Sequence, residues 1–147
     1  MLGRLCRWIR ILGFSAEYVS SDQDDSSILE RAVNSGRIIV TRDVQLSSRA
    51  KGSLLVRSLE IDDQLAEFIG TYRPSMEDMF SRCTLCDSRL EIISSSDPVI
   101  SLPPAIKERF QEVYWCDHCG KAYWHGTHYD QMRMKISRLL GDAHEDS

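Results

Sequence analysis

The hydrophobic positions in the first half of the chain change their spacing several times, and each spacing predicts a different kind of element. Apolar residues recur at helical spacing over residues 2–12 and again over 28–35, and a glycine follows each stretch. Residues 14–19, which lie between these helices, predict a short strand. Residues 37–40 form a continuous apolar run with β-branched side chains, which is typical of a strand buried on both faces.

The same alternation of helix and strand continues downstream. We expect a short helix over 44–51, a second buried strand over 53–57 and a helix over 62–72, after which Pro74 breaks the pattern. Strands that alternate with helices favour parallel pairing. The sequence therefore predicts an α/β domain with a parallel sheet over residues 1–75.

The second half of the chain has a different pattern and predicts a smaller module. A strand is expected at 90–94, a helix at 104–113 and a closing helix from about 127 to 140. We therefore divide the rest of the chain into a second domain over 76–140 and a disordered tail over 141–147.

Two Cys-x-x-Cys pairs carry the strongest chemical signal, and their members are Cys83, Cys86, Cys116 and Cys119. Each pair can hold one metal ion from both ends of a tight turn, and two pairs complete the tetrahedral thiolate shell that suits structural Zn²⁺. Two disulfides or a redox dithiol are the alternatives. His118 lies inside the second pair and could replace a ligand, but four thiolates already suffice.

Acidic residues follow the predicted strands of the first domain. Asp24 and Asp25 stand at the start of a helix, and Asp43 comes soon after the 37–40 run. If the strands are neighbours, Asp25 and Asp43 lie on the same rim, where carboxylates can hold Mg²⁺ or Mn²⁺ that activates water against a phosphodiester. The alternative is a local role, with Asp24 or Asp25 as a helix cap and Asp43 as a turn former.

Arginines accompany these acids and are candidates for binding an anionic substrate. Arg4, Arg7 and Arg10 form a row at helical spacing, and Arg42 stands directly before Asp43. A solvated helix face is the alternative interpretation of the row.

Length and composition limit the class of protein. The chain has 147 residues, 42% of them hydrophobic, and a net charge of −4, which fits a globular protein and excludes a basic nucleic-acid coat. No apolar run approaches the ~20 residues of a membrane span, so no membrane association is expected. Zinc-type cysteine spacing with an unpaired fifth thiol, Cys6, favours a reducing cytoplasm.

Several motifs of the chain resemble those of a known nuclease family. The motifs are Met1-Leu2-Gly3-Arg4-Leu5, Asp24-Asp25 with Ile28-Leu29, Gly36-Arg37-Ile38-Ile39-Val40-Thr41-Arg42-Asp43, Cys83-x-x-Cys86, Pro103-Pro104, Cys116-x-x-Cys119-Gly120 and Gly126-Thr127-His128-Tyr129. Together they resemble the RNase domain found alone in many prokaryotes and at the C-terminus of the Mutator-seven exoribonucleases. That family joins a PIN-like nuclease domain to a zinc ribbon.

The resemblance implies a metal-dependent ribonuclease that hydrolyses RNA. Asp25 and Asp43 would be metal-binding acids of a PIN-like centre, with Asp24 a nearby helper, and the four paired cysteines would hold zinc. Family members usually begin with a strand that ends in an aspartate, upstream of the segment that matches Met1. The resemblance therefore implies that this first strand and its acid are missing here, through a start placed too late or through loss, and predicts a weakened sheet with an exposed edge.

Two functions are weighed against each other. Asp25 and the Thr41-Arg42-Asp43 element favour the ribonuclease, whereas the missing first acid favours a non-catalytic module that binds RNA or the ribosome through a degenerate nuclease fold. A protein partner docked on the ribbon is a third hypothesis.

His128 could contact phosphate as part of the substrate site, cap the last helix or pack on the first domain.

Overall fold

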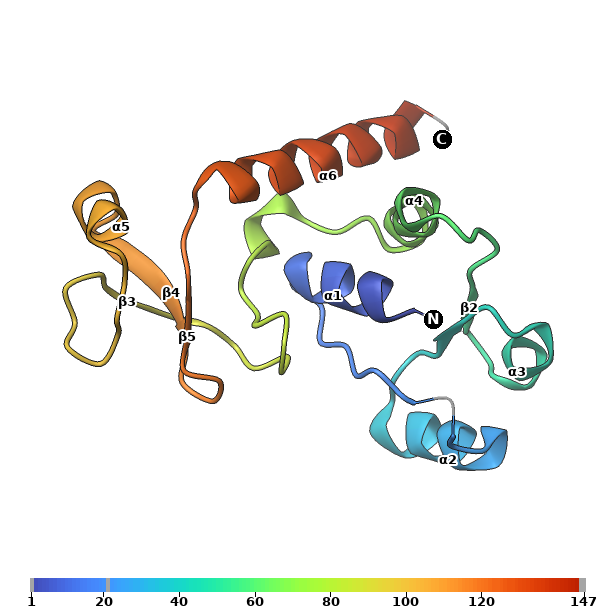
Figure 1. Ribbon diagram of the computed structural model, residues 1–147. Coiled ribbons are helices and arrows are strands. Elements are labelled where there is room, and N and C mark those ends of the chain that lie inside the picture. Colours follow the sequence, from blue (N-terminus) through green and yellow to red (C-terminus); the bar gives the residue numbers. More distant parts are fainter. Residues whose placement is uncertain (1, 21, 146–147) are drawn as a thin grey trace.

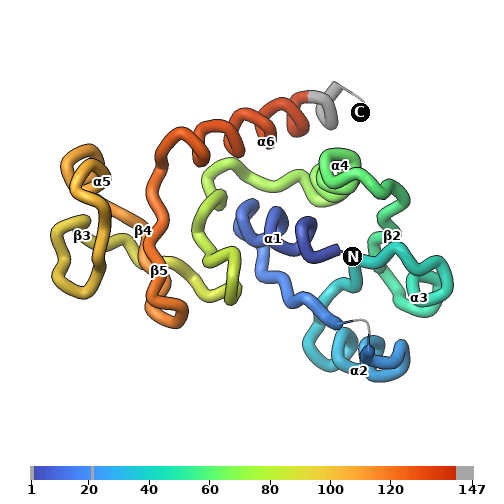
Figure 2. The backbone as a smooth tube through the Cα atoms, in the orientation of Figure 1, coloured from blue at the N-terminus to red at the C-terminus, as the bar shows by residue number. Residues whose placement is uncertain are grey.

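A computed structural model describes residues 2–20 and 22–145 of the chain. The elements in chain order are α1 (Gly3–Ile11), α2 (Asp25–Ser35), β1 (Val40–Thr41), α3 (Val44–Arg49), β2 (Leu54–Leu55), α4 (Ile61–Tyr72), the 3₁₀ turn η1 (Met76–Asp78), β3 (Glu91–Ser94), α5 (Pro104–Arg109), β4 (Glu112–Cys116), β5 (Lys121–Tyr123) and α6 (Thr127–Glu145). Helix α1 lies in the middle of the view, and α4 and α6 lie above it, with α6 along the upper edge (Figures 1 and 2). The β1–β2 region with α2 and α3 lies to one side of them, and β3, β4, β5 and α5 lie to the other.

The fold-class prediction is confirmed, since a small parallel sheet is followed by an antiparallel sheet that carries the four-cysteine cluster. In the parallel sheet Val40 lies opposite Leu54, and Thr41 lies opposite Leu55. Each of these strands is only two residues long, shorter than the apolar runs predicted. Helix α3 connects the two strands and contacts both of them.

Residues 14–19 form no regular element, which corrects the strand predicted there. Side chains take the place of a neighbouring strand: the Ala16 carbonyl accepts a hydrogen bond from Arg10 Nε, and the Ala16 N–H donates to Asp87 Oδ1, both at 2.9 Å. Phe14 packs edge-on against an aromatic ring of α4, with the ring centroids 5.3 Å apart. Tertiary contacts therefore fix this segment and override its local β propensity.

Helices α2, α3 and α4 agree with the predictions because their signals are local. Asp24 and Asp43 are the N-cap residues of α2 and α3. Gly36 ends α2 in the left-handed conformation, at φ 68°, which a residue without Cβ adopts at no steric cost.

The core of the first half is completed by the last helix of the chain. Leu5 of α1, Leu65 and Ile69 of α4, and Ile136 of α6 are fully buried in one cluster. Helix α6 also brings a stripe of partly buried residues onto this cluster at helical spacing, namely Tyr129, Met132, Leu139 and Leu140. The second module therefore lies between α4 and α6 in the sequence, while these two helices contact each other directly in the fold.

Two boundaries in the second half differ from the predictions. The helix expected at 104–113 ends at Arg109, because the chain turns into β4, where Val113 is completely buried opposite Ile93 of β3. The closing helix continues to Glu145, into the segment 141–147 that was expected to be disordered. Residues 146–147 of that predicted tail lie outside the described residues.

Asp87 joins the two halves of the molecule. Its carboxylate accepts hydrogen bonds from Ser15 Oγ at 2.6 Å and from the Ala16 N–H at 2.9 Å. Arg10 and Arg82 add positive charge on either side, with nitrogen–oxygen distances of 3.6 and 3.8 Å. Asp87 follows the first cysteine pair at φ 72°, so the turn that shapes this cysteine pair also holds the segment after α1.

His125 forms a second junction, between the antiparallel sheet and α6. Its ring stacks between Tyr114 of β4 and Tyr129 of α6, with centroid distances of 4.4 and 3.7 Å. The His125 Nε2 atom is buried and has no hydrogen-bond partner among the described residues. Burial lowers the pKa of His125, Arg133 lowers it further and Asp130 opposes the shift.

Candidate metal centre and active site

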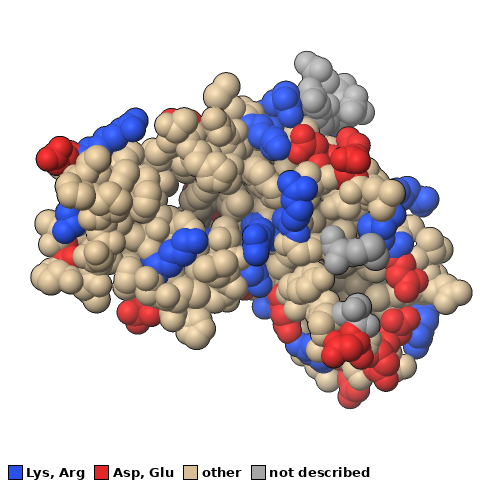
Figure 3. Space-filling view, in the orientation of Figure 1, with Lys and Arg blue, Asp and Glu red and all other residues tan. Residues whose placement is uncertain are grey.

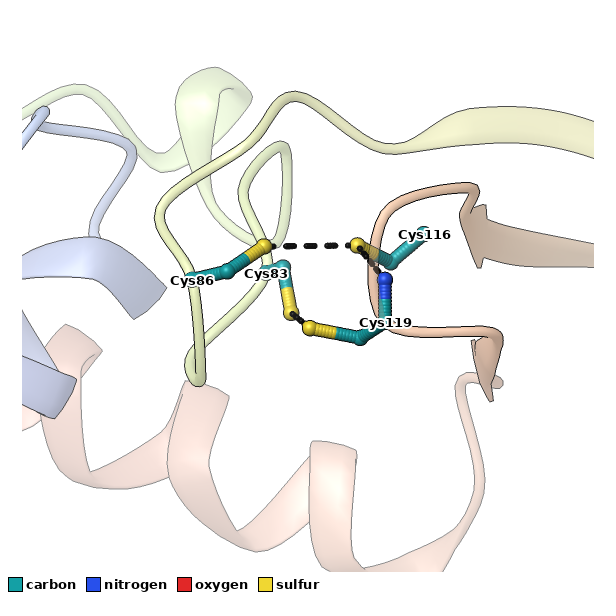
Figure 4. A group of neighbouring side chains, drawn as sticks. All are labelled: Cys83, Cys86, Cys116 and Cys119. Carbon is teal, nitrogen blue, oxygen red and sulfur yellow. Dashed lines mark hydrogen bonds between the residues drawn. The ribbon is translucent and has the colours of Figure 1, made fainter.

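The four paired cysteines converge on one point from two turns, one before β3 and one between β4 and β5 (Figure 4). All four sulfur atoms lie within 4.8 Å of one another; Cys83 and Cys119 Sγ are 3.9 Å apart, and Cys86 and Cys116 Sγ are 3.4 Å apart. Tetrahedral zinc with Zn–S bonds of ~2.3 Å requires sulfur–sulfur distances of about 3.8 Å. Disulfide bonds would need ~2.05 Å, so the cysteines are free thiols, and their arrangement could hold a metal ion such as zinc.

Hydrogen bonds from neighbouring groups orient two of the sulfur atoms. The Cys119 N–H donates to Cys116 Sγ at 3.3 Å, and the Tyr123 hydroxyl lies 3.2 Å from Cys83 Sγ. The same hydroxyl lies 3.3 Å from Thr84 Oγ1. Such partners fix the direction of metal ligands and are part of a built metal site.

The thiols of this cluster differ in acidity. A hydrogen bond from Ser88 lowers the pKa of Cys86 to about 6, whereas a hydrogen bond with Cys86 raises the pKa of Cys119 to about 12. Cys86 therefore loses its proton more readily than Cys119. A zinc ion needs all four groups as thiolates, so its binding releases protons and strengthens as pH rises.

Asp24 and Asp25 lie at the start of α2, as predicted, but they have different surroundings. Asp24 Oδ1 accepts a hydrogen bond from the Ser27 N–H at 2.9 Å, and the hydrogen bonds from Ser27 lower the pKa of Asp24. The Asp25 carboxylate instead lies 4.0 Å from Arg49 Nη1 of α3, so the start of α2 faces α3. Asp24 is therefore the N-cap of α2, whereas the Asp25 side chain is not used as a cap.

Asp43 follows β1 and holds the start of α3. Its Oδ1 accepts hydrogen bonds from the backbone N–H groups of Gln45 at 2.9 Å and Leu46 at 3.2 Å. Its own N–H donates to Thr41 Oγ1 at 3.0 Å. Three hydrogen bonds within the Thr41–Leu46 turn thus fix the position of Asp43.

Asp25, Arg42 and Asp43 line a common cavity of about 760 Å³. The rest of its lining comes from residues 14–20, from α2, from residues 36–41 and from a few apolar side chains of α1 and α4. Within the described residues, the four cysteines form the only group of three or more His, Cys, Asp or Glu side chains placed to share a metal ion. The structure thus brings Asp25 and Asp43 to one cavity without gathering all three predicted acids around one point.

Comparison with known protein families gives a match over residues 1–136, to the Mut7-C RNAse domain. The chain belongs to the Mut7-C RNase domain family. This confirms the resemblance drawn from the motifs and suggests ribonuclease activity with RNA as the substrate. Searches of curated proteins and of solved structures found no match.

The predicted substrate-binding residues of this Mut7-C RNase domain are spread over several places. Arg42 lies at the cavity of the two acids, and Arg4, Arg7 and Arg10 line a separate pocket against α1. His128 lies exposed in the first turn of α6, outside both linings. Among the described residues no helix is both long enough and apolar enough to cross a membrane.

Sequence reasoning missed three residues that shape these sites. Asp87 and His125 join the two modules through contacts with distant residues, so no local pattern could reveal them. Tyr18 lines both the cavity and the pocket beside α1. Tyr18 is 49% exposed although it is a large aromatic residue, and this exposure is visible only in the structure.

Proposed function

We propose that this chain is a metal-dependent ribonuclease that hydrolyses RNA phosphodiester bonds at the cavity lined by Asp25 and Asp43. The observation that carries the proposal is that these two acids, which stand at the starts of different helices, line the same cavity in a chain of an RNase family. Paired carboxylates are the donor set that Mg²⁺ or Mn²⁺ prefers, so the residues present fit such an ion. When bound, the ion would orient and activate water and neutralise charge on the phosphate.

The side chains around the cavity supply positioning and charge. Backbone N–H groups hold one oxygen of Asp43, so its second oxygen would serve as the metal ligand. Arg49 steadies Asp25 from α3, and Arg42 adds a cation at the same lining to attract the phosphate. In the reaction, water adds to phosphorus, one P–O ester bond breaks and the departing oxygen takes up a proton.

A non-catalytic RNA- or ribosome-binding module is the second candidate function. It is favoured by the use of Asp24 as a helix cap and by the lack of a three-carboxylate group among the described residues. The zinc ribbon would then serve as a docking surface for RNA or for a protein partner. In either case thiolate ligands require a reducing compartment, so we assign the protein to the cytoplasm.

Cleavage of a labelled single-stranded RNA with added Mn²⁺ or Mg²⁺ tests the proposal. Asp25→Asn and Asp43→Asn each replace a ligand charge with a residue that is also a good helix cap, so both variants should fold. Removing a group that only hydrogen-bonds to a metal ligand already lowers metal affinity or activity about 10–100-fold. Because these variants remove a ligand itself, we expect each to lose more than about 100-fold in cleavage rate. Asp63→Asn, an exposed change in the first turn of α4, is the matched control.

The outcome separates the two candidate functions. Cleavage that needs the added metal and is lost in both variants but kept in Asp63→Asn would support the ribonuclease. Salt-sensitive RNA binding without cleavage, under every metal tested, would refute it and favour the binding module.

A further inference from the structure

A second pocket lies between α1 and the turn of the first cysteine pair. Its volume is about 450 Å³, within the range of ordinary ligand sites. One wall is the basic face of α1, and the other is the backbone and side chains of Thr84 and Leu85, which stand between two of the zinc-binding cysteines. We call it the basic pocket, and its full lining is Gly3, Arg4, Cys6, Arg7, Arg10, Tyr18, Thr84 and Leu85.

The three arginines of the basic pocket do not play the same part. Arg10 is 12% exposed and is used by the fold, since it donates hydrogen bonds to the carbonyls of Ala16 and Thr84, both at 2.9 Å, and lies near Asp87. Arg4 and Arg7 are exposed and form no hydrogen bond or ion pair with any described residue. Two unneutralised guanidinium groups therefore face solvent at the mouth of the basic pocket.

Apolar groups stand beside these charges. Tyr18 is 49% exposed and Leu85 is 52% exposed, although both are large hydrophobic residues. Basic side chains interleaved with exposed aromatic and aliphatic ones are typical of surfaces that bind single-stranded nucleic acid, where arginines contact phosphates and aromatic rings stack on bases. Lys and Arg side chains gather over the middle of the face shown in Figure 3, whereas Asp and Glu gather over α2.

The basic pocket also adjoins the cavity of the two acids. Tyr18 and Cys6 line both spaces, so the two spaces are neighbours. A strand held at the basic pocket can pass over Tyr18 into the cavity that Asp25 and Asp43 also line.

We propose that the basic pocket binds single-stranded RNA and directs it toward the acidic cavity. Arg4 and Arg7 contact the phosphates, and Tyr18 and Leu85 contact a base or ribose. The direction of the strand rests on the proposed ribonuclease function, whereas binding at the basic pocket does not. Because Leu85 belongs to a cysteine turn, zinc shapes one wall of this RNA site.

Fluorescence anisotropy with a labelled oligouridine tests this proposal, using the zinc-loaded full chain with Asp43→Asn to prevent cleavage. The double variant Arg4→Gln/Arg7→Gln keeps good helix formers on an exposed face. It should weaken RNA binding about tenfold and lower the salt slope by about 1.4, since each single-strand phosphate contact contributes about 0.7. Tyr18→Leu should weaken binding by about tenfold through lost stacking.

The matched control is Arg133→Gln/Arg138→Gln, which removes the same charge from exposed positions of α6 outside the basic pocket. Equal losses in the two double variants, or no loss in either, would overturn the proposal. Arg4- and Arg7-dependent binding of an oligoglutamate peptide in preference to RNA would also overturn it and make the pocket a protein-docking site.

Cleavage by the unmodified chain, measured in parallel, keeps this proposal separate from the ribonuclease. If the chain cleaves RNA but RNA binding does not depend on Arg4 and Arg7, the basic-pocket proposal is refuted and the ribonuclease proposal stands. If RNA binding depends on Arg4 and Arg7 but the chain does not cleave RNA, the basic-pocket proposal is supported and the ribonuclease proposal is refuted.

Discussion

Replacing Asp87 tests whether one carboxylate holds the two modules together. Asp87→Ala removes the acceptor of the Ser15 hydroxyl and the Ala16 N–H and leaves Arg10 and Arg82 without their counter-charge. It also places an alanine at φ 72°, a conformation that Asp tolerates better. Asp87→Asn keeps the tolerant backbone and one acceptor oxygen but removes the charge.

The expected loss follows from these contacts. A hydrogen bond to a charged acceptor contributes at least ~1.5 kcal/mol, and two of them are lost in Asp87→Ala. The left-handed backbone adds ~1 kcal/mol, so the total is about 4 kcal/mol. Asp87→Asn loses mainly the attraction of two partly exposed arginines, for which about 1.5 kcal/mol is appropriate after solvent screening.

Urea unfolding of the zinc-loaded chain measures these losses. With a slope of ~2 kcal/mol per molar urea, Asp87→Ala should lower the midpoint by about 2 M, and Asp87→Asn should lie between it and the unmodified chain. Asp117→Asn, an exposed change in the turn of the second cysteine pair, should leave the midpoint unchanged. If Asp87→Ala and Asp117→Asn had the same midpoint, the junction role of Asp87 would be refuted.

Three further predictions concern a glycine, a histidine and the zinc ion. Gly13→Ala should lower the free energy of unfolding in urea by at least ~3 kcal/mol, because φ is +101° and the added Cβ would lie 2.4 Å from the Asp78 carbonyl oxygen. Gly36→Ala, at φ +68° with open space around it, should lower it by only ~1 kcal/mol. Because burial lowers the pKa of His125, the unfolded chain binds more protons below pH ~6.5, so stability should fall as pH drops from neutral. His125→Phe should flatten this part of the pH profile relative to the unmodified chain, whereas the exposed His118→Gln should not. Chelation of zinc should red-shift the tryptophan emission of the ribbon and weaken RNA binding, and added zinc should restore both.

The parts of the fold with local signals could be predicted from the sequence. Helix caps at Asp24 and Asp43 and the stop at Gly36 act within a few residues, so α2 and α3 were placed well. The cysteine ligands were equally accessible, because the Cys-x-x-Cys spacing encodes the turn that brings each pair of sulfur atoms together.

The segment at 14–19 shows why the remainder could not be predicted. Its alternating pattern is that of a strand, yet Arg10 and Asp87 satisfy the Ala16 backbone, and Asp87 lies 71 residues away in the chain. The position of the acidic cavity depends on this irregular path, since Tyr18 and Asp25 line it together. Sequence order alone placed Asp25 and Asp43 after predicted strands, but it could not show that Arg10 and Asp87 hold Ala16, which lines the cavity.

The return of α6 to the first half has a consequence for the biosynthesis of the protein. A nascent chain leaves the ribosome from its N-terminus, and the core of α1 and α4 stays open until Ile136 has emerged. Cys119, the last of the four ligands, emerges before that residue. Zinc capture can therefore precede closure of the core, and a chain released before α6 would expose the apolar surface of α4 to the degradation machinery of the cell.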